Sequence, residues 1–155
     1  MESALTGSLR LSQELEARIR AHAAETYPYE CCGALLGRDG EEGREVLALL
    51  PLENRRDDSP RNRFSIAPED VLLAEQKARE QRMDLLGWYH SHPDHPAQPS
   101  EFDREHAWPW YSYIIVRSES QETKEMNSWR LADDRASYTR EPIEAITPAA
   151  VERRS

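Results

Sequence analysis

The N-terminal part of the chain places apolar residues at the spacing of one helical face. Leu15, Ile19 and Ala23 recur every four residues with polar residues between them. Ser12 precedes this pattern as a candidate N-cap, and acidic residues in the following turn suit the positive end of the helix dipole. The pattern therefore predicts a helix from about Ser12 to Glu25.

Two further helices are predicted from their start signals. Pro68, followed by Glu69 and Asp70, places a proline and two acids in a first turn, and this helix is expected to run to about Arg82. Ser100 is expected to begin another helix.

Short apolar runs bounded by glycine predict buried strands. Cys31–Leu36 is one such run, and Val46–Leu52 is expected to pair with it as a hairpin across the turn Arg38–Gly43. Leu85–Tyr89 is another, and it is expected to deliver His90 at its end, where a loop begins. The remaining predictions are a polar loop over Asn54–Arg63 and short strands at Phe64–Ile66, Tyr111–Val116 and Ser128–Leu131.

Helices that alternate with hairpin-linked strands favour an α/β sandwich with a mixed or largely antiparallel sheet. A length of 155 residues suits one domain with its own core. Met1–Gly7 lack periodicity and form either a loose end or a leading edge strand, and the pattern is lost again from about Pro142. We therefore predict an N-terminal extension over residues 1–8, a domain over 9–141 and a C-terminal tail over 142–155.

The charge balance argues against nucleic acid as a partner. Twenty Lys and Arg residues against 29 Asp and Glu residues give a net charge of −9, and the field of such a protein repels a phosphate backbone. No apolar run approaches the roughly 20 residues that span a bilayer, and the first residues lack the basic-then-apolar order of a secretory signal. We expect a cytoplasmic protein that does not bind membranes.

The two cysteines, Cys31 and Cys32, are adjacent. A disulfide between neighbours would be strained, so they do not indicate an oxidising compartment. Neither is spaced from another cysteine as a zinc ligand would be, and free cysteine commonly behaves as a small apolar residue. We predict that both belong to the core.

The most informative chemistry lies in His90-Ser91-His92-Pro93. Residues two apart in an extended chain project to the same side, so both imidazoles can point at one ion, whereas Ser91 faces away and is given no role. Zinc accepts imidazole nitrogen and carboxylate oxygen, and a catalytic zinc site keeps three protein ligands and a water. Asp103 is the natural third ligand.

Each part of this pattern also has an ordinary structural explanation. Ser100–Asp103 is a capping box, and His-x-His pairs occur on surface strands without a metal. His95 and His106 are assigned to such ordinary roles. The joint order of the parts favours a metal site: an isolated glutamate at a strand start, a strand ending in His-x-His-Pro, a short loop and then Pro-Ser-x-x-Asp.

In this order the chain resembles the JAMM/MPN+ (Mov34/JAB) zinc metalloprotease family, in particular its compact prokaryotic branch. The family pattern is an upstream glutamate, His-x-His, seven intervening residues and Ser-x-x-Asp. The positions that fit it without a gap are Glu30, His90, His92, Ser100 and Asp103. The resemblance covers about Leu9 to Asp133, and its most similar segments are Tyr29–Gly37, Arg63–Asp70 and Gly87–Pro93.

The resemblance implies a cytidine-deaminase-like α/β sandwich with helices on both sides of the sheet. It implies one zinc ion at one end, held by His90, His92 and Asp103 together with a catalytic water. Glu30 would take the proton of that water and pass it to the leaving amine, acting as a base and not as a ligand. Ser100 would stabilise the oxyanion by donating a hydrogen bond, in addition to capping its helix.

The resemblance also implies a zinc metalloprotease that hydrolyses peptide or isopeptide bonds after the C-terminal Gly-Gly of ubiquitin-like, β-grasp sulfur-carrier proteins. Such a protein or its conjugates would be the partner, and a homodimer is left open. One alternative is a peptidase that releases an amino acid such as cysteine from a carrier-protein C-terminus. Another is an MPN-type interaction scaffold, which has no reason to keep all five site residues. A zinc deaminase is disfavoured because no Pro-Cys-x-x-Cys follows.

Two features bear on how a substrate would bind. Trp88, Trp108 and Trp110 are candidates for a substrate groove near the metal, although aromatic residues beside a strand more often serve packing. The loop Pro93–Ser100 and the stretch Arg104–Tyr111 leave little room for insertions that grip a second ubiquitin. Substrate selection is therefore expected to be loose, or to depend on docking of the substrate's tail at a sheet edge.

Overall fold

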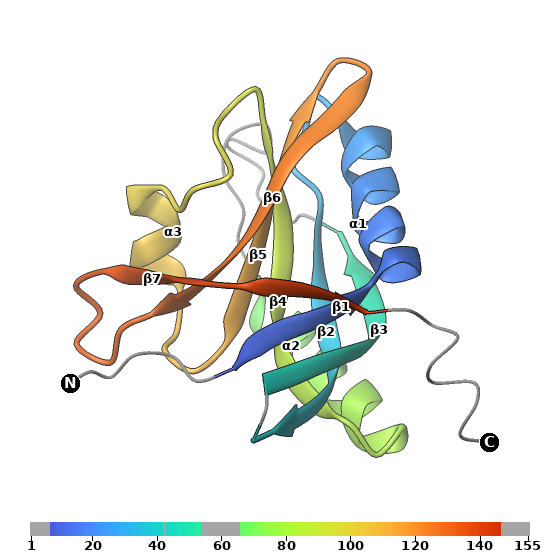
Figure 1. The fold of residues 1–155 in the computed structure, drawn as a ribbon, viewed down its shortest axis with the longest axis vertical. Helices are drawn as coiled ribbons and strands as arrows, with labels where there is room; N and C mark the ends of the chain where they lie inside the picture. Colours follow the sequence, from blue (N-terminus) through green and yellow to red (C-terminus); the bar gives the residue numbers. More distant parts are fainter. Residues whose placement is uncertain (1–6, 42, 54–65, 147–155) are drawn as a thin grey trace.

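A computed structural model describes residues 7–41, 43–53 and 66–146 (Figure 1). The predicted loop Asn54–Arg63, and Phe64 and Ser65 of the predicted short strand, lie outside these ranges. The elements, in chain order, are β1 (Ser8–Ser12), α1 (Gln13–Thr26), β2 (Cys32–Gly40), β3 (Gly43–Leu52), α2 (Pro68–Glu80), β4 (Asp84–Pro93), α3 (Glu101–His106), β5 (Ser112–Glu119), β6 (Glu122–Leu131), β7 (Tyr138–Glu141) and β8 (Ile143–Ile146).

The strands form one eight-stranded sheet in the order β7-β6-β5-β4-β2-β3-β1-β8. β2 pairs antiparallel with β3 and β4, and β6 pairs antiparallel with β5 and β7. The pairs β1–β3, β1–β8 and β4–β5 are parallel. The predicted mixed, mostly antiparallel sheet is confirmed, as is the predicted β2–β3 hairpin.

One face of the sheet is covered by α1 (Figure 1). The helix begins as predicted, because the Leu15 N–H donates to the Ser12 Oγ at 3.2 Å. Leu15, Ile19 and Ala23 are buried in a cluster with apolar residues of β1, β2, β4 and β5. Cys31 belongs to the same cluster, so its predicted place in the core is confirmed.

The opposite face carries α2, which was predicted to start at Pro68. Its residues Ala74 and Ala78 pack in a second apolar cluster with Cys32 and Trp88. Helices therefore lie on both faces of the sheet, as expected, and both cysteines are buried thiols. None of the helices in the described ranges is long and apolar enough to span a bilayer.

The two ends of the sheet differ from the sequence prediction. The expected loss of pattern from Pro142 is wrong for residues 143–146, because β8 pairs in parallel with β1. Only Pro142 separates β8 from β7, and the two short strands form opposite edges of the sheet. β1 begins at Ser8 and lies between β3 and β8. The predicted loose end or edge strand over Met1–Gly7 falls, except for Gly7, outside the described residues. Strands of four or five residues carry too little alternation to be recognised without their partners.

Candidate metal centre

The two histidines lie inside β4, which continues to Pro93, whereas the sequence prediction placed His90 at the end of the strand. β4 pairs with β2 on one side and with β5 on the other, which keeps its backbone extended through Pro93. Alternation along the strand places His90 and His92 on the face that carries Trp88 in the second cluster. The predicted i, i+2 arrangement is confirmed, and the loop begins at Asp94 instead of after His90.

Asp103 reaches the histidines from α3. The Asp103 N–H donates to the Ser100 Oγ at 3.0 Å, and the Ser100 N–H donates to the Asp103 Oδ2 at 2.9 Å, so the predicted capping box is present. The Ser100 oxygen accepts in this box, which leaves its own O–H to donate elsewhere. The cap therefore fixes the carboxylate of Asp103 without using the hydroxyl proton of Ser100.

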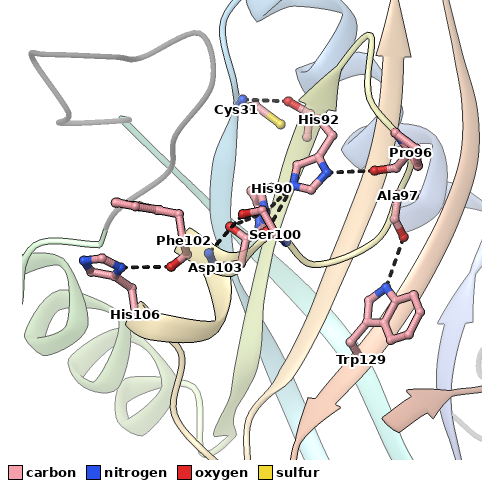
Figure 2. Close-up of polar contacts among 11 residues, drawn as sticks. Cys31, His90, His92, Pro96, Ala97, Ser100, Phe102, Asp103, His106 and Trp129 are labelled. Carbon is pink, nitrogen blue, oxygen red and sulfur yellow. Dashed lines mark hydrogen bonds and ion pairs between the residues drawn. The ribbon is translucent and has the colours of Figure 1, made fainter. Parts of the chain in front are cut away.

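The three side chains converge on one point (Figure 2). The Nε2 atoms of His90 and His92 lie 3.2 Å apart, His92 Nε2 is 3.1 Å from Asp103 Oδ2, and His90 Nε2 is 3.4 Å from Asp103 Oδ1. Two ligand atoms of a tetrahedral zinc ion, each about 2.0–2.1 Å from the metal, are about 3.3 Å apart. The spacing fits three corners of a tetrahedron, so these residues could hold one metal ion.

The contacts of His92 show which nitrogen faces this point. Its Nδ1 lies 2.8 Å from the carbonyl oxygen of Pro96, which can only accept, so Nδ1 carries a proton. In a neutral ring Nε2 then presents a lone pair to the Asp103 carboxylate, which is also an acceptor. A cation between the two groups removes this conflict, and a histidine oriented by a backbone carbonyl is typical of metal ligands.

The loop between β4 and α3 is fixed to β6 through Ala97, which is fully buried. The Ala97 carbonyl accepts from Asn127 Nδ2 at 3.1 Å. It also accepts from Trp129 Nε1 at 3.1 Å (Figure 2). The Ala97 N–H donates to Glu125 Oε2 at 3.2 Å. These contacts set the path of the chain from the histidines to α3, and the sequence contains no pattern that reveals them.

Glu30 lies two residues before β2 and is only 4% exposed. Cys31 packs in the cluster of the α1 face and Cys32 in the cluster of the opposite face. If the chain is extended here, Glu30 shares the face of Cys32 and therefore of the two histidines. Among the described residues, the candidate ligand group contains His90, His92 and Asp103 but not Glu30.

Burial and charge give the two carboxyl groups opposite tendencies. Burial raises the pKa of Glu30 to about 9, and the nearby Asp103 carboxylate contributes in the same direction. Burial alone would also raise the pKa of Asp103, but the close contacts of its carboxylate with the imidazoles of His90 and His92 hold that pKa well below its usual range. Burial lowers the pKa of His90 despite the opposing effect of Asp103. Burial thus favours the protonated form of Glu30, whereas the neighbouring histidines favour the ionised form of Asp103.

An apolar groove of about 980 Å³ opens beside the ligands. His90 and Asp103 line it, α2 contributes Leu72, and the segment after α3 contributes Trp108 and Trp110. The side chains of Leu72, Trp108 and Trp110 are 66%, 64% and 46% exposed. The sequence-based alternative of aromatic residues beside a groove is confirmed for these two tryptophans. Trp88 also lines the groove, but it is buried in the core.

Two arginines contact the exposed tryptophans. The guanidinium carbon of Arg44 lies 4.0 Å from the Trp110 ring centroid, and that of Arg135 lies 5.5 Å from the Trp108 ring centroid. Trp110 also has a φ of 87°, in the left-handed region that residues with a side chain seldom adopt. Large exposed aromatic residues held in this way are typical of binding surfaces.

The other two candidate histidines lie outside the ligand group, as expected. His95 is exposed. His106 stacks on Phe102 with ring centroids 4.0 Å apart, and its Nδ1 lies 2.9 Å from the Phe102 carbonyl oxygen (Figure 2). His106 lines the groove at a position removed from the converging ligand atoms.

Known proteins resemble this chain over most of its length. A family model described as prokaryotic homologs of the JAB domain matches residues 12–132, a range that includes all five predicted site residues. A desampylase from Haloferax volcanii is 36% identical over 123 residues, which are 75% of this chain and 86% of that protein. A CysO-cysteine peptidase from Mycobacterium tuberculosis is 29% identical over 128 residues, which are 81% of this chain and 83% of that protein.

A solved structure shows the same fold. The solution structure of a Desulfitobacterium hafniense protein has a TM-score of 0.79 and 31% sequence identity, and the match covers 90% of this chain and 93% of that chain.

Proposed function

Because the chain belongs to the family of prokaryotic homologs of the JAB domain, we propose that it is a zinc-dependent peptidase acting on ubiquitin-like carrier proteins. The bond cleaved follows the C-terminal Gly-Gly of a β-grasp protein, in an extended precursor or in an isopeptide-linked conjugate. The observation that carries this proposal is the convergence of two imidazoles and one carboxylate at 3.1–3.4 Å. The likeness to a desampylase supports the class of substrate.

The proposed metal ligands are His90, His92 and Asp103. Two imidazoles and a carboxylate form a donor set found in hydrolytic zinc sites, where the fourth position is left to water. A zinc ion there supplies a water whose pKa is lowered to about 7 and an electrophile for the substrate carbonyl. The chain contributes a hydrogen bond from His92 Nδ1–H to the Pro96 carbonyl, which leaves Nε2 facing the site.

Glu30 is proposed to be the general base and acid. Its carboxyl would accept a proton from the attacking water and return it to the departing amine. The raised pKa of about 9 supports this role, because it marks a carboxyl that can hold a proton near neutral pH. A cation on the neighbouring ligands would lower that pKa toward the working pH.

Ser100 is proposed to stabilise the oxyanion that forms on the substrate carbonyl. Its oxygen accepts the capping bond from the Asp103 N–H, so its hydroxyl proton can point to a substrate. One such donor is typically worth about 2.7–4 kcal/mol. Capping and oxyanion stabilisation can therefore reside in one side chain.

A second candidate function differs in the leaving group. The likeness to a CysO-cysteine peptidase supports release of a single amino acid from the end of a carrier protein. Both candidates place the cut after the last glycine of the carrier. A scaffold without activity is disfavoured because it has no need for the convergence of His90, His92 and Asp103.

The test uses a β-grasp carrier protein extended past its terminal diglycine in three ways: by one cysteine, by a longer peptide and by an isopeptide-linked lysine. Each is incubated with zinc-loaded protein and analysed by mass spectrometry, with Glu30→Gln as the control. We expect a product that ends at the diglycine, and the preferred extension identifies the leaving group. Intact substrates in all three reactions would contradict the proposal.

A further inference from the structure

Ser91, which the sequence left without a role, makes two hydrogen bonds to the residue that follows Glu30. The Cys31 N–H donates to the Ser91 Oγ at 2.8 Å (Figure 2), and the Ser91 N–H donates to the Cys31 carbonyl at 3.2 Å. Both residues are fully buried. The last β2–β4 pair in register is Cys32 with His90. The Ser91–Cys31 pair therefore continues the contact between the two backbone segments to the residue before β2 begins.

This pair lies on the face of the sheet opposite the metal centre. Ser91 stands between His90 and His92, so its side chain points toward the α1 face, where Cys31 packs. If the chain is extended at Cys31, the preceding residue, Glu30, lies on the face of the histidines. The direction of the Glu30 side chain therefore depends on the backbone at Cys31, whose N–H donates to the Ser91 hydroxyl.

A second contact ties the same segment to the chain after β4. The Tyr27 hydroxyl donates to the carboxylate of Asp94, with its oxygen 3.0 and 2.9 Å from the two carboxylate oxygens. Tyr27 caps the end of α1, and Asp94 directly follows β4. Glu30 therefore lies between two attachment points of the connection from α1 to β2, one on β4 at Ser91 and one directly after β4 at Asp94.

We propose that Ser91 is a positioning residue that acts through Glu30. Its hydroxyl holds the Cys31 backbone, and this fixes the Glu30 carboxyl relative to the ligands that β4 carries. The inference rests on the proposed function of Glu30 as the base. A displacement of about 1 Å in a catalytic group can lower the rate about 10²-fold, so loss of the hydroxyl should slow the chemical step and leave substrate binding intact.

The matched control is Ser118, a fully buried serine on β5, the strand beside β4. Its hydroxyl has no hydrogen-bond partner in the described part of the chain. Ser91→Ala is expected to keep one zinc per chain and an unchanged KM while kcat falls about 10–10²-fold. Ser118→Ala is expected to match the wild type in zinc content, KM and kcat. A wild-type kcat in Ser91→Ala would overturn the inference. So would a loss of activity that is explained by lower zinc content or a higher KM.

Two further measurements keep the inference testable. In a Glu30→Gln background, Ser91→Ala should produce no additional loss, because a residue acting through Glu30 has nothing left to position; a further loss of the same size contradicts this. If Ser91→Ala does not fold, Ser91→Cys replaces the hydroxyl by a weak acceptor of similar shape, and it should still lower kcat. A wild-type kcat in the cysteine variant would contradict the inference.

Hydrogen exchange of the Cys31 amide separates this inference from the proposed function, because it needs no substrate. Exchange should be about tenfold or more faster in Ser91→Ala than in Ser118→Ala. If the wild type cleaves no carrier protein but this difference is found, the proposed function fails and the attachment of Cys31 to Ser91 stands. If exchange is equal in the two variants, the attachment itself fails.

Discussion

The Nδ1 atom of His92 lies 2.8 Å from the carbonyl oxygen of Pro96. Because a carbonyl only accepts hydrogen bonds, this contact keeps the proton on Nδ1 and directs the lone pair of Nε2 toward Asp103. Pro96 belongs to the loop that Ala97 attaches to β6. The loop thus sets the path to α3 and also which ring nitrogen of His92 carries the proton.

His92→Ala should abolish both metal binding and hydrolysis. Removing one of three protein ligands leaves a site too weak to retain zinc through purification and dialysis. His95→Ala is the matched control, since His95 is exposed and lies three residues later, in the loop that follows β4, and it should bind one zinc per chain. Metal content by inductively coupled plasma mass spectrometry checks both variants. Equal zinc content in His92→Ala and His95→Ala would show that His92 is not a metal ligand.

Glu30→Gln should keep zinc and lose activity. Glutamine preserves the shape of the side chain but cannot take up a proton, and general acid–base catalysis typically contributes about 10²–10⁴-fold. The measurement is kcat on an extended carrier protein, with metal content determined on the same sample. A variant with normal zinc and a rate near that of the wild type would take the base role away from Glu30.

The metal-free protein should become less stable as pH rises, in part because of Glu30. The pKa of this carboxyl is raised by burial from 4.5 to about 9 in the folded state, so the folded state binds the proton more tightly than the unfolded state. The stabilisation is complete below the lower value and is lost as pH rises toward the higher one, at up to about 1.4 kcal/mol per pH unit.

Glu30→Gln removes this titration. Its free energy of unfolding, relative to the wild type, should therefore increase between about pH 5 and about pH 8 in the presence of a chelator. Glu41→Gln, at an exposed position, is the control and should follow the wild type. Urea denaturation at both pH values provides the comparison. Parallel pH dependence in Glu30→Gln and the wild type would show that Glu30 does not titrate in this way.

Ser100→Ala should affect both stability and catalysis. Loss of the capping bond costs about 0.5–2 kcal/mol, and loss of an oxyanion donor lowers kcat about 10²–10³-fold. Ser12 caps α1 with the same chemistry, accepting from the Leu15 N–H, but lies away from the site. Ser12→Ala should lose stability and keep kcat. If both variants keep the wild-type kcat, Ser100 serves only as a cap.

The groove predicts a difference between two neighbouring leucines of α2. Leu72 lines the groove and is 66% exposed, whereas Leu73 is 38% exposed and lies outside the lining. Leu72→Ala should raise KM about fivefold, which corresponds to roughly 1 kcal/mol of lost contact. Leu73→Ala should leave KM unchanged. Steady-state kinetics on the extended carrier protein measures both, and equal KM values would place substrate binding elsewhere.

The ligand group could be predicted because each of its parts has a local signal. His90 and His92 share a face through strand alternation, and Asp103 occupies a defined position in the capping box of Ser100. The structure then supplies what local signals cannot, which is the distance between the strand and the helix. That distance depends on Ala97 and its partners on β6, about 30 residues later in the chain.

Other features depended on contacts between distant parts of the sequence. The expectation that Ser91 faces away from the metal agrees with the structure, but its partner Cys31 is 60 positions earlier. The position of the Trp110 ring could not be read from a pattern of aromatic residues, because the ring contacts Arg44 on β3, which is distant in the sequence. β8 was missed because four residues show no clear period, and only pairing with β1 defines it as a strand.

X-ray absorption at the zinc edge, on protein reconstituted with one equivalent of zinc, tests the central claim most directly. We expect four nitrogen or oxygen neighbours at about 2.0–2.1 Å, with the outer-shell scattering of two imidazoles. His92→Ala should remove one imidazole from that pattern or bind no zinc. A zinc ion without imidazole neighbours, or wild-type protein that takes up no zinc, would contradict the account.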